Sequence, residues 1–197
     1  MPDKFLVVGL GNVGARYAFT RHNVGFEVVD ALASRYGVSW SSARYANTAF
    51  FRLRGRMVYL IKPTTYMNRS GKAARYWCEV LKVSCENFLV LLDDVSLPLC
   101  RIRLRPKGGS AGHNGLEDII QTMSTDRFPR LRIGIGNNYP WGKQVEYVLG
   151  HWSDAELGKL RMVLNAAADA VETFILEGLS AAMNRFNGGW WCETEDR

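Results

Sequence analysis

The sequence has no long apolar run. None of its hydrophobic stretches approaches the ~18 residues that a transmembrane helix requires. Its first residues, Met1 to Phe5, lack the basic region, the apolar region and the cleavage site of a signal peptide. We therefore expect a cytoplasmic protein with no membrane-embedded part.

Cysteine and proline are also scarce. The four cysteines do not have the spacing of zinc ligands, and we expect them to be free thiols, with neither a disulfide nor a metal. None of the six prolines belongs to a Pro-rich linker, and no repeat or low-complexity tract interrupts the chain. We expect a single α/β domain over residues 1–187, followed by a flexible C-terminal tail over residues 188–197.

The composition that remains is globular and basic. The chain has 197 residues, of which 47% are hydrophobic and 22% charged, so it can bury a core of its own. Its 25 Lys and Arg residues against 19 Asp and Glu residues give a net charge of +6. Such a surplus favours a polyanionic partner.

Strand and helix patterns alternate along the chain, which is typical of an α/β fold. Residues 87–92 are continuously apolar, as in a central strand covered on both faces. Ser153 and Glu156 have the spacing of a capping box that begins a long helix. Strands are predicted at 5–8, 48–53, 57–61, 87–92, 101–105 and 131–135, and helices at 23–36, 70–81, 113–123, 153–177 and 181–186.

The segment from Gly9 to Gly14 reads GLGNVG and matches the pattern G-x-G-x-x-G. A dinucleotide site would need a helix to begin at once and an acidic residue at the end of a second strand. The next predicted helix begins only near Asn23, and no such acid follows. A tight turn in which glycine lets two backbone segments approach closely is the simpler interpretation, and a nucleotide-dependent oxidoreductase is the weaker alternative.

His22 and Asp93 each follow an apolar strand. The carboxyl ends of strands are where α/β proteins bind ligands, and in a doubly wound sheet two such places can adjoin. A carboxylate that contacts an imidazole fixes its tautomer and favours its charged form. The two residues are therefore a candidate catalytic pair, although an Asp at a strand end often only caps a helix or forms a turn.

Two asparagines precede predicted helices. Asn68 lies where a loop meets a helix, and Asn114 follows the glycine-rich loop at 108–112. Both are suited to capping, but amides beside a His–Asp pair can also bind peptide groups, donating to a carbonyl and accepting from an N–H. The loop lacks the G-K-[ST] ending of a P-loop, so we expect it to form a mobile wall of the site.

Five segments together resemble the bacterial-type peptidyl-tRNA hydrolases in order and spacing. The similarity runs from about Lys4 to Phe186. It implies a monomeric α/β hydrolase with a twisted mixed β-sheet surrounded by helices, which needs no metal or cofactor. Such an enzyme cleaves the ester between a nascent peptide and the 3′ ribose of tRNA and so recycles the tRNA. The segments are residues 9–30, 62–73, 93–98, 107–120 and 128–136.

The resemblance also implies roles for individual residues. The family's catalytic histidine corresponds to His22 and its carboxylate partner to Asp93. We expect His22 to act as a general base on water and Asp93 to orient it. Val13 departs from the family pattern, which usually has proline there. The residues expected to bind the substrate are Asn12, Tyr17, Met67, Asn68 and Asn114.

A basic stretch between Arg101 and Arg132 favours contact with tRNA phosphates. Seven Lys and Arg residues and three Asp and Glu residues in this stretch leave a surplus of seven minus three, or four. Alternation along the strand at 101–105 places three arginines on one face, where they can meet phosphates without reading bases. An ordinary solvated face is the alternative. The predicted contacts are Arg101, Arg103, Arg105, Lys107, Arg130 and Arg132.

A second function remains open at this point. A plant organellar splicing factor resembles the same family, so a non-catalytic RNA-binding relative would use the same basic face without turnover. The intact pair His22 and Asp93, with its set of asparagines, argues against that alternative.

Overall fold

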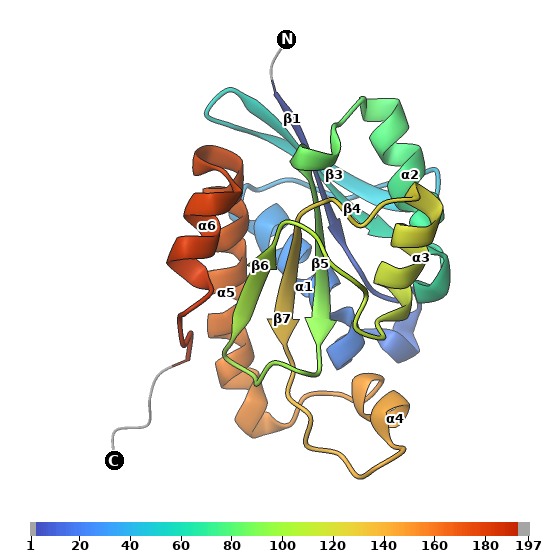
Figure 1. The fold of residues 1–197 in the computed structure, drawn as a ribbon, viewed down its shortest axis with the longest axis vertical. Helices are drawn as coiled ribbons and strands as arrows, with labels where there is room; N and C mark the ends of the chain where they lie inside the picture. Colours follow the sequence, from blue (N-terminus) through green and yellow to red (C-terminus); the bar gives the residue numbers. More distant parts are fainter. Residues whose placement is uncertain (1–2, 193–197) are drawn as a thin grey trace.

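A seven-stranded mixed sheet forms the centre of the molecule in the computed structural model, which describes residues 3–192 (Figure 1). The strand order is β2-β3-β4-β1-β5-β7-β6. This confirms the predicted fold class of a twisted mixed sheet with helices around it. The strands are β1 (Lys4–Gly9), β2 (Ser41–Ala43), β3 (Ala46–Leu53), β4 (Arg56–Pro63), β5 (Phe88–Asp94), β6 (Ile102–Arg105) and β7 (Arg130–Gly134).

The middle of the sheet is parallel and its two edges are antiparallel. β1 pairs in parallel with β4 and with β5, and β5 pairs in parallel with β7. β2 and β3 at one edge, and β6 at the other, run antiparallel to their neighbours. The carboxyl ends of the central strands therefore meet at one end of the sheet, which is where open α/β sheets bind ligands.

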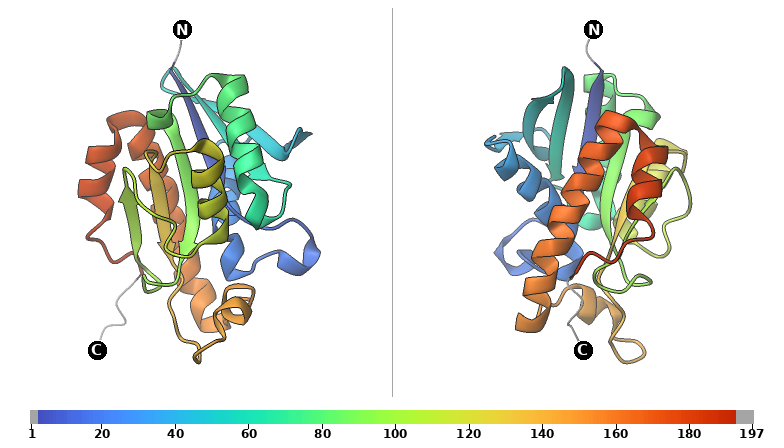
Figure 2. Two further views of the ribbon diagram at one scale, coloured as in Figure 1. Left: turned by 45° about the vertical axis from the view of Figure 1, so that its right-hand side comes forward. Right: turned by 90° about the vertical axis from the view of Figure 1, so that its left-hand side faces the viewer.

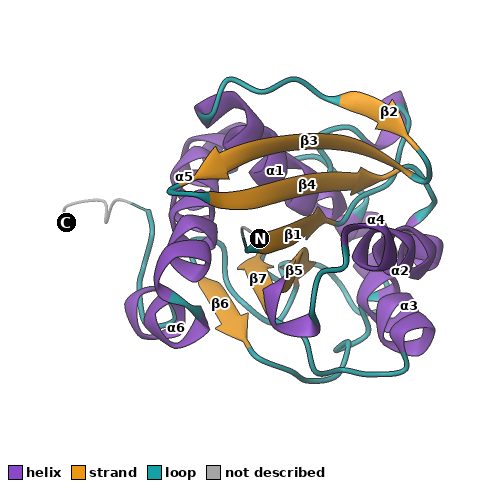
Figure 3. Ribbon diagram, turned by 90° about the horizontal axis from the view of Figure 1, so that it is seen from above, coloured by secondary structure: helices purple, strands orange, loops and turns teal. Residues whose placement is uncertain are grey.

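Helices cover both faces of the sheet (Figures 2 and 3). Side chains alternate along β1, so Val7 packs with α1 and α5 while Val8 packs with α2 and α3. None of the helices in the described part of the chain is both long and apolar enough to cross a membrane. The helices are α1 (Val24–Arg35), α2 (Ser70–Leu81), α3 (Asn114–Met123), α4 (Gln144–Val148), α5 (Asp154–Glu177) and α6 (Leu179–Phe186).

The predicted elements all form, with shifted boundaries. The capping box at the start of α5 is present, because the Ser153 and Glu156 side chains each bond to the other's backbone N–H. The hairpin strands β3 and β4 are longer than predicted, and α6 begins two residues earlier. β2 and α4 were not predicted, since three and five residues are too few for a periodic pattern to appear.

A disulfide joins the C-terminal segment to the residue that follows β5 and precedes β6. The sulfur atoms of Cys100 and Cys192 are bonded, so the expectation of free thiols is wrong for this pair. The Trp191 backbone N–H also donates to the carbonyl oxygen of Cys100 at 2.9 Å. The predicted flexible tail is therefore wrong for residues 188–192, while residues 193–197 lie outside the described part of the chain.

The glycines near the N-terminus allow α1 to pack directly on β1. A Cβ atom on Gly25 would lie 2.6 Å from the Leu10 nitrogen and 2.5 Å from the Leu91 carbonyl oxygen. Gly9 faces the carbonyl group of Gly25 in the same contact. The G-x-G-x-x-G segment thus serves close backbone approach, and α1 begins only at Val24.

We expect Gly25→Ala to lower the free energy of unfolding by about 1–3 kcal/mol, because the added methyl group has no space. Gly158→Ala is the matched control, since Gly158 is exposed in α5 and a Cβ there meets nothing within 4 Å. It should raise stability by about 0.5–1 kcal/mol through better helix propensity. Urea unfolding measures both changes, and equal effects would contradict the packing argument.

Candidate active site

A cavity of about 530 Å³ lies at the carboxyl ends of β1 and β5. His22 enters it from the 3₁₀ helix Arg21–Asn23, and Asp93 enters from β5. Gln144, Val145, Val148 and Leu149, in α4 and directly after it, line another part of the cavity. Seven residues predicted as catalytic or substrate-binding come together in its lining: Asn12, Tyr17, His22, Met67, Asn68, Asp93 and Asn114.

The His22 imidazole is hydrogen-bonded to the Asp93 carboxylate. Nδ1 of His22 lies 2.9 Å from Oδ1 and 3.0 Å from Oδ2 of Asp93. Because an ionised carboxylate only accepts hydrogen bonds, Nδ1 carries the proton and Nε2 is left with a free lone pair. The arrangement holds the imidazole in the tautomer in which Nε2 can accept a proton.

A second histidine, His113, contacts the same carboxylate. Its Nε2 lies 2.9 Å from Oδ1 of Asp93, and its Nδ1 accepts a hydrogen bond from the Leu116 backbone N–H at 3.2 Å. The two rings are 4.8 Å apart between centroids. Sequence reasoning took His113 only as the start of a helix, although its place beside Asn114 at the end of the glycine-rich loop was a usable signal.

The environment of Asp93 keeps its carboxyl group ionised. Burial alone raises the pKa of Asp93, but the charge and hydrogen bond of His113 and then those of His22 outweigh it. The net result is a pKa well below the usual carboxyl range. Asp93 is therefore negatively charged at neutral pH and available to both imidazoles.

Asn12 is held in the cavity wall by hydrogen bonds to its side-chain oxygen and to its backbone. Its Oδ1 accepts a hydrogen bond from the Met67 backbone N–H at 2.8 Å. The Asn23 side chain binds both backbone groups of Asn12. Its Oδ1 accepts from the Asn12 N–H at 2.8 Å, and its Nδ2 donates to the Asn12 carbonyl at 2.9 Å. Nδ2 of Asn12 has no hydrogen-bond partner in the described part of the chain, so it is available to donate to a ligand in the cavity. Asn23 is a brace that sequence reasoning did not identify.

The other two asparagines are exposed at the rim of the cavity. Asn68 lies in the 3₁₀ helix Met67–Arg69, and Asn114 is the first residue of α3. The N-cap of α3 is His113 and not Asn114, so the capping interpretation of Asn114 is wrong. Both amides remain able to donate and accept.

Arg21 connects the turn that contains His22 with residues 147–156 on another side of the cavity. Its Nη2 lies 2.8 Å from Oε2 of Glu156, and its guanidinium group stacks 4.3 Å from the centre of the Tyr147 ring. Its backbone N–H donates to the Gly150 carbonyl at 3.0 Å. These contacts make residues 144–150 and the His22 turn one packed unit.

The predicted phosphate-binding residues fall into two groups. Arg103, Arg105 and Lys107 reach the surface on β6 and just after it. Arg103 and Arg105 lie directly opposite Arg132 and Arg130 in the β6–β7 pair. Arg132 is paired with the Asp94 carboxylate at 3.3 Å and Arg130 is buried against backbone carbonyls, so Arg103 and Arg105 are the members of these pairs that can meet an anion at the surface.

The remaining predicted contacts, Arg101, Arg130 and Arg132, donate hydrogen bonds to backbone carbonyl groups of the protein. Arg130 is fully buried and donates to the carbonyl oxygens of Phe128 and Asp126, so the predicted phosphate contact at Arg130 is wrong. Arg132 lies in the cavity wall and donates to the Gly109 carbonyl at 2.7 Å. Arg101 donates to carbonyl groups of the C-terminal segment. Buried arginines with main-chain partners cannot be distinguished from surface ones by sequence spacing.

His22, Asp93 and His113 are the residues in the described part of the chain that could hold a metal ion. Their ligand atoms lie within 4.8 Å of one another. A metal between them would replace the hydrogen bonds that set the tautomers of both rings. The resemblance predicts that the site works without a metal. Activity measured in the presence of a chelator tests that prediction.

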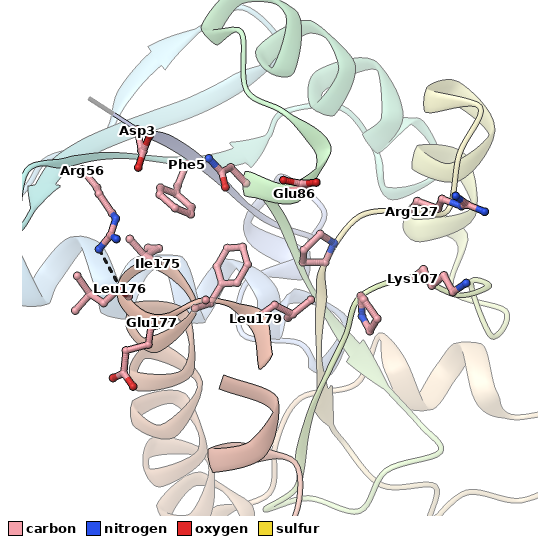
Figure 4. Close-up of a pocket in the computed structure, with 15 residues that line it drawn as sticks. Asp3, Phe5, Arg56, Glu86, Lys107, Arg127, Ile175, Leu176, Glu177 and Leu179 are labelled. Carbon is pink, nitrogen blue, oxygen red and sulfur yellow. Dashed lines mark hydrogen bonds between the residues drawn. The ribbon is translucent and has the colours of Figure 1, made fainter. Parts of the chain in front are cut away.

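A larger cavity of about 870 Å³ lies at the opposite end of the sheet, where β1 begins and α5 ends (Figure 4). Arg56 in its wall donates to the Leu176 carbonyl at 3.2 Å. Over residues 3–192, no imidazole or thiol lines this cavity, and its acidic and basic side chains form no ion pair with one another. The predicted catalytic and substrate-binding residues thus line the smaller cavity and not the larger one.

The fold and the site define a class of protein. A half-buried histidine paired with a buried carboxylate, beside amides at the carboxyl end of an α/β sheet, is suited to a hydrolase that activates water. No serine or cysteine side chain among the described residues is hydrogen-bonded to His22, so a nucleophile of the serine-protease kind is not in place.

Comparison with known proteins identifies the family. The sequence model of the family Peptidyl-tRNA hydrolase matches residues 6–195, and the chain belongs to this family. The peptidyl-tRNA hydrolase of Phocaeicola vulgatus is 46% identical, covering 93% of this chain and 98% of the relative. That of Cytophaga hutchinsonii is 47% identical with the same coverage. The crystal structure of the Acinetobacter baumannii peptidyl-tRNA hydrolase matches with a TM-score of 0.88 and 34% identity, over 95% of this chain and 96% of that one.

Family membership confirms the predicted resemblance and makes this chain a hydrolase. It does not favour the non-catalytic RNA-binding alternative or the nucleotide-dependent oxidoreductase.

Proposed function

We propose that this chain hydrolyses the ester between a peptide, or another N-blocked aminoacyl group, and the 3′ end of tRNA, so that the tRNA is recycled. The observation that carries the proposal is the hydrogen-bonded pair His22 and Asp93 at the floor of a cavity with amide donors. The protein acts in the cytoplasm as a monomer, and metal is not needed.

His22 acts as the general base. Nε2 takes a proton from a water molecule as that water attacks the ester carbonyl carbon. Asp93 accepts from Nδ1–H and stabilises the imidazolium that forms. When the tetrahedral intermediate collapses, the ribose oxygen leaves and takes the proton from Nε2, which restores the neutral imidazole.

The asparagines bind the peptide and the developing negative charge. Because Oδ1 of Asn12 already accepts from the Met67 N–H and its Nδ2 is unpaired, the amide NH₂ of Asn12 donates to the carbonyl oxygen and stabilises it as charge builds up. Asn68 and Asn114 bind backbone groups of the peptide or position the water, because both of their polar atoms are free. Tyr17 and Met67 form the walls of the peptide site.

Arg103, Arg105 and Lys107 bind phosphates of the tRNA. Their contacts are independent of base sequence, which suits an enzyme that accepts many tRNAs. Arg103 and Arg105 lie on the edge strand β6 and form no ion pair with any described residue, so both are available to an anion.

Release of free tRNA from an N-acetyl-aminoacyl-tRNA, with EDTA present, tests the proposal. We expect steady release of tRNA and of the N-acetyl amino acid. Binding of tRNA without release would favour the RNA-binding relative, and release that EDTA abolishes would assign the His22, Asp93 and His113 cluster to a metal.

A further inference from the structure

A second basic surface borders the cavity on the side away from β6. It combines four exposed cations with two tyrosine rings, and we call it the α2 surface. The turn between β2 and β3 supplies two of its residues, and α2 with the residue before it supplies the rest. Its residues are Arg44, Tyr45, Arg69, Lys72, Arg75 and Tyr76.

The rings hold two of the cations, Arg44 and Lys72, in place without neutralising them. The Arg44 guanidinium carbon lies 5.1 Å from the centre of the Tyr45 ring and 5.3 Å from that of Tyr76. Nζ of Lys72 lies 4.6 Å from the Tyr45 ring. Side chains held in this way keep their charge and lose less freedom when they bind an anion.

Little negative charge opposes these cations. Arg75 pairs with Glu79 at 2.8 Å, whereas Arg44, Arg69 and Lys72 form no ion pair with any described residue. The nearby Asp118 carboxylate accepts from the Gly71 backbone N–H at 2.7 Å and so belongs to the start of α2. The hydrogen bond from Arg44 also lowers the pKa of the Tyr45 phenol, as a positive local potential does.

The α2 surface is continuous with the rim of the cavity. The Tyr45 carbonyl accepts from the Thr64 backbone N–H at 2.8 Å, and the chain then passes directly into the cavity lining at Tyr66. Arg69 immediately follows Asn68. A hollow of about 490 Å³ between α2 and α3 extends the surface outward from this point.

We propose that the α2 surface binds the ribose-phosphate chain of the RNA whose 3′ end enters the cavity. This contact is additional to the one proposed at β6. The proposal rests on the proposed function. Cations interleaved with aromatic rings suit phosphates and stacked bases of any sequence. A nascent peptide varies in charge from one substrate to the next, so it is the less suitable partner for a constantly basic surface.

The test compares two triple variants that remove the same charge. Arg44→Gln, Lys72→Gln and Arg75→Gln alter the α2 surface. Arg52→Gln, Arg54→Gln and Arg161→Gln are the control, because these arginines are exposed on β3, in the β3–β4 turn and on α5. Thermal unfolding establishes that both variants are folded.

For N-acetyl-aminoacyl-tRNA, we expect the α2 variant to raise KM about tenfold at physiological salt with kcat unchanged, as when two phosphates of the RNA are no longer bound. The slope of log KM against log salt should fall by about one for each phosphate that the variant fails to bind. The corresponding ester of adenosine, which has no phosphates, should be hydrolysed as by the unaltered protein. The control variant should show none of these changes.

The outcomes separate this proposal from the proposed function. Equal KM values for the two triple variants overturn the α2 surface alone. A loss that also appears with the adenosine ester, and that grows with the acidity of the peptide, assigns the surface to peptide and overturns the RNA contact. If the unaltered protein releases no tRNA, the proposed function fails, and direct tRNA binding by the same variants still decides for or against the surface.

Discussion

Replacing His22 by alanine is expected to lower kcat for N-acetyl-aminoacyl-tRNA by about 10²–10⁴-fold, which is what a general base typically contributes. KM should change little, because the phosphate and peptide contacts remain. The expectation follows from the geometry of the ring, whose Nδ1 is bonded to Asp93 while Nε2 is free. Initial rates of tRNA release measure the effect.

His113→Ala is the matched control for this prediction. His113 binds the same carboxylate, but its Nδ1 is occupied by the Leu116 backbone N–H and its Nε2 by Asp93, so neither nitrogen can take a proton from water. Its loss should cost less activity than the loss of His22. Equal losses in the two variants would contradict the assignment of the base to His22.

Replacing Asp93 by asparagine is expected to lower kcat by about 10²–10⁴-fold as well. The amide keeps the shape of the side chain. Only one of its two polar atoms, the oxygen, can accept a hydrogen bond from an imidazole, whereas both oxygens of Asp93 can do so. His22 then loses the partner that holds Nδ1–H and stabilises the imidazolium. The same release assay measures the change.

Asp94→Asn tests whether the effect is specific to the carboxylate that meets His22. Asp94 bonds to Ser96 and Arg132 and to neither imidazole. We expect a smaller loss of activity from this variant, and an equal loss would mean that general disturbance of the strand end explains both.

Asp93 also links stability to pH. Folding lowers the pKa of this carboxyl group, so the ionised form stabilises the folded state at neutral pH. That contribution is lost as pH falls below the usual carboxyl range, and Asp93→Asn should remove it. The variant therefore separates a catalytic effect, seen at neutral pH, from an effect on acid stability.

The sequence predicted the architecture because its strands are apolar and its helices have clear ends. The continuous apolar run of β5 and the capping box of α5 carry this information locally. β2 and α4 escaped prediction because packing against neighbours, and not local pattern, makes them form. The Cys100–Cys192 disulfide escaped prediction because its partners are 92 residues apart.

All seven predicted catalytic and substrate-binding residues line the cavity, yet their supporting residues were not predicted. His113, Asn23 and Arg21 act through contacts with residues distant in sequence. The hydrogen bond that Asn12 Oδ1 accepts from the Met67 N–H joins residues that are 55 positions apart, so sequence pattern does not reveal it. The burial of Arg130 likewise depends on the loops around it, which strand alternation does not describe.

The pH dependence of kcat/KM for N-acetyl-aminoacyl-tRNA, measured with EDTA present, tests the central claim most directly. The lowered pKa of Asp93 keeps that group ionised throughout the accessible range, so its protonation does not change the rate. Protonated Nε2 cannot accept the proton of water, so the rate should fall with unit slope as the pH is lowered and His22 takes up a proton. A rate that stays flat through the range in which histidine titrates would contradict His22 as the base.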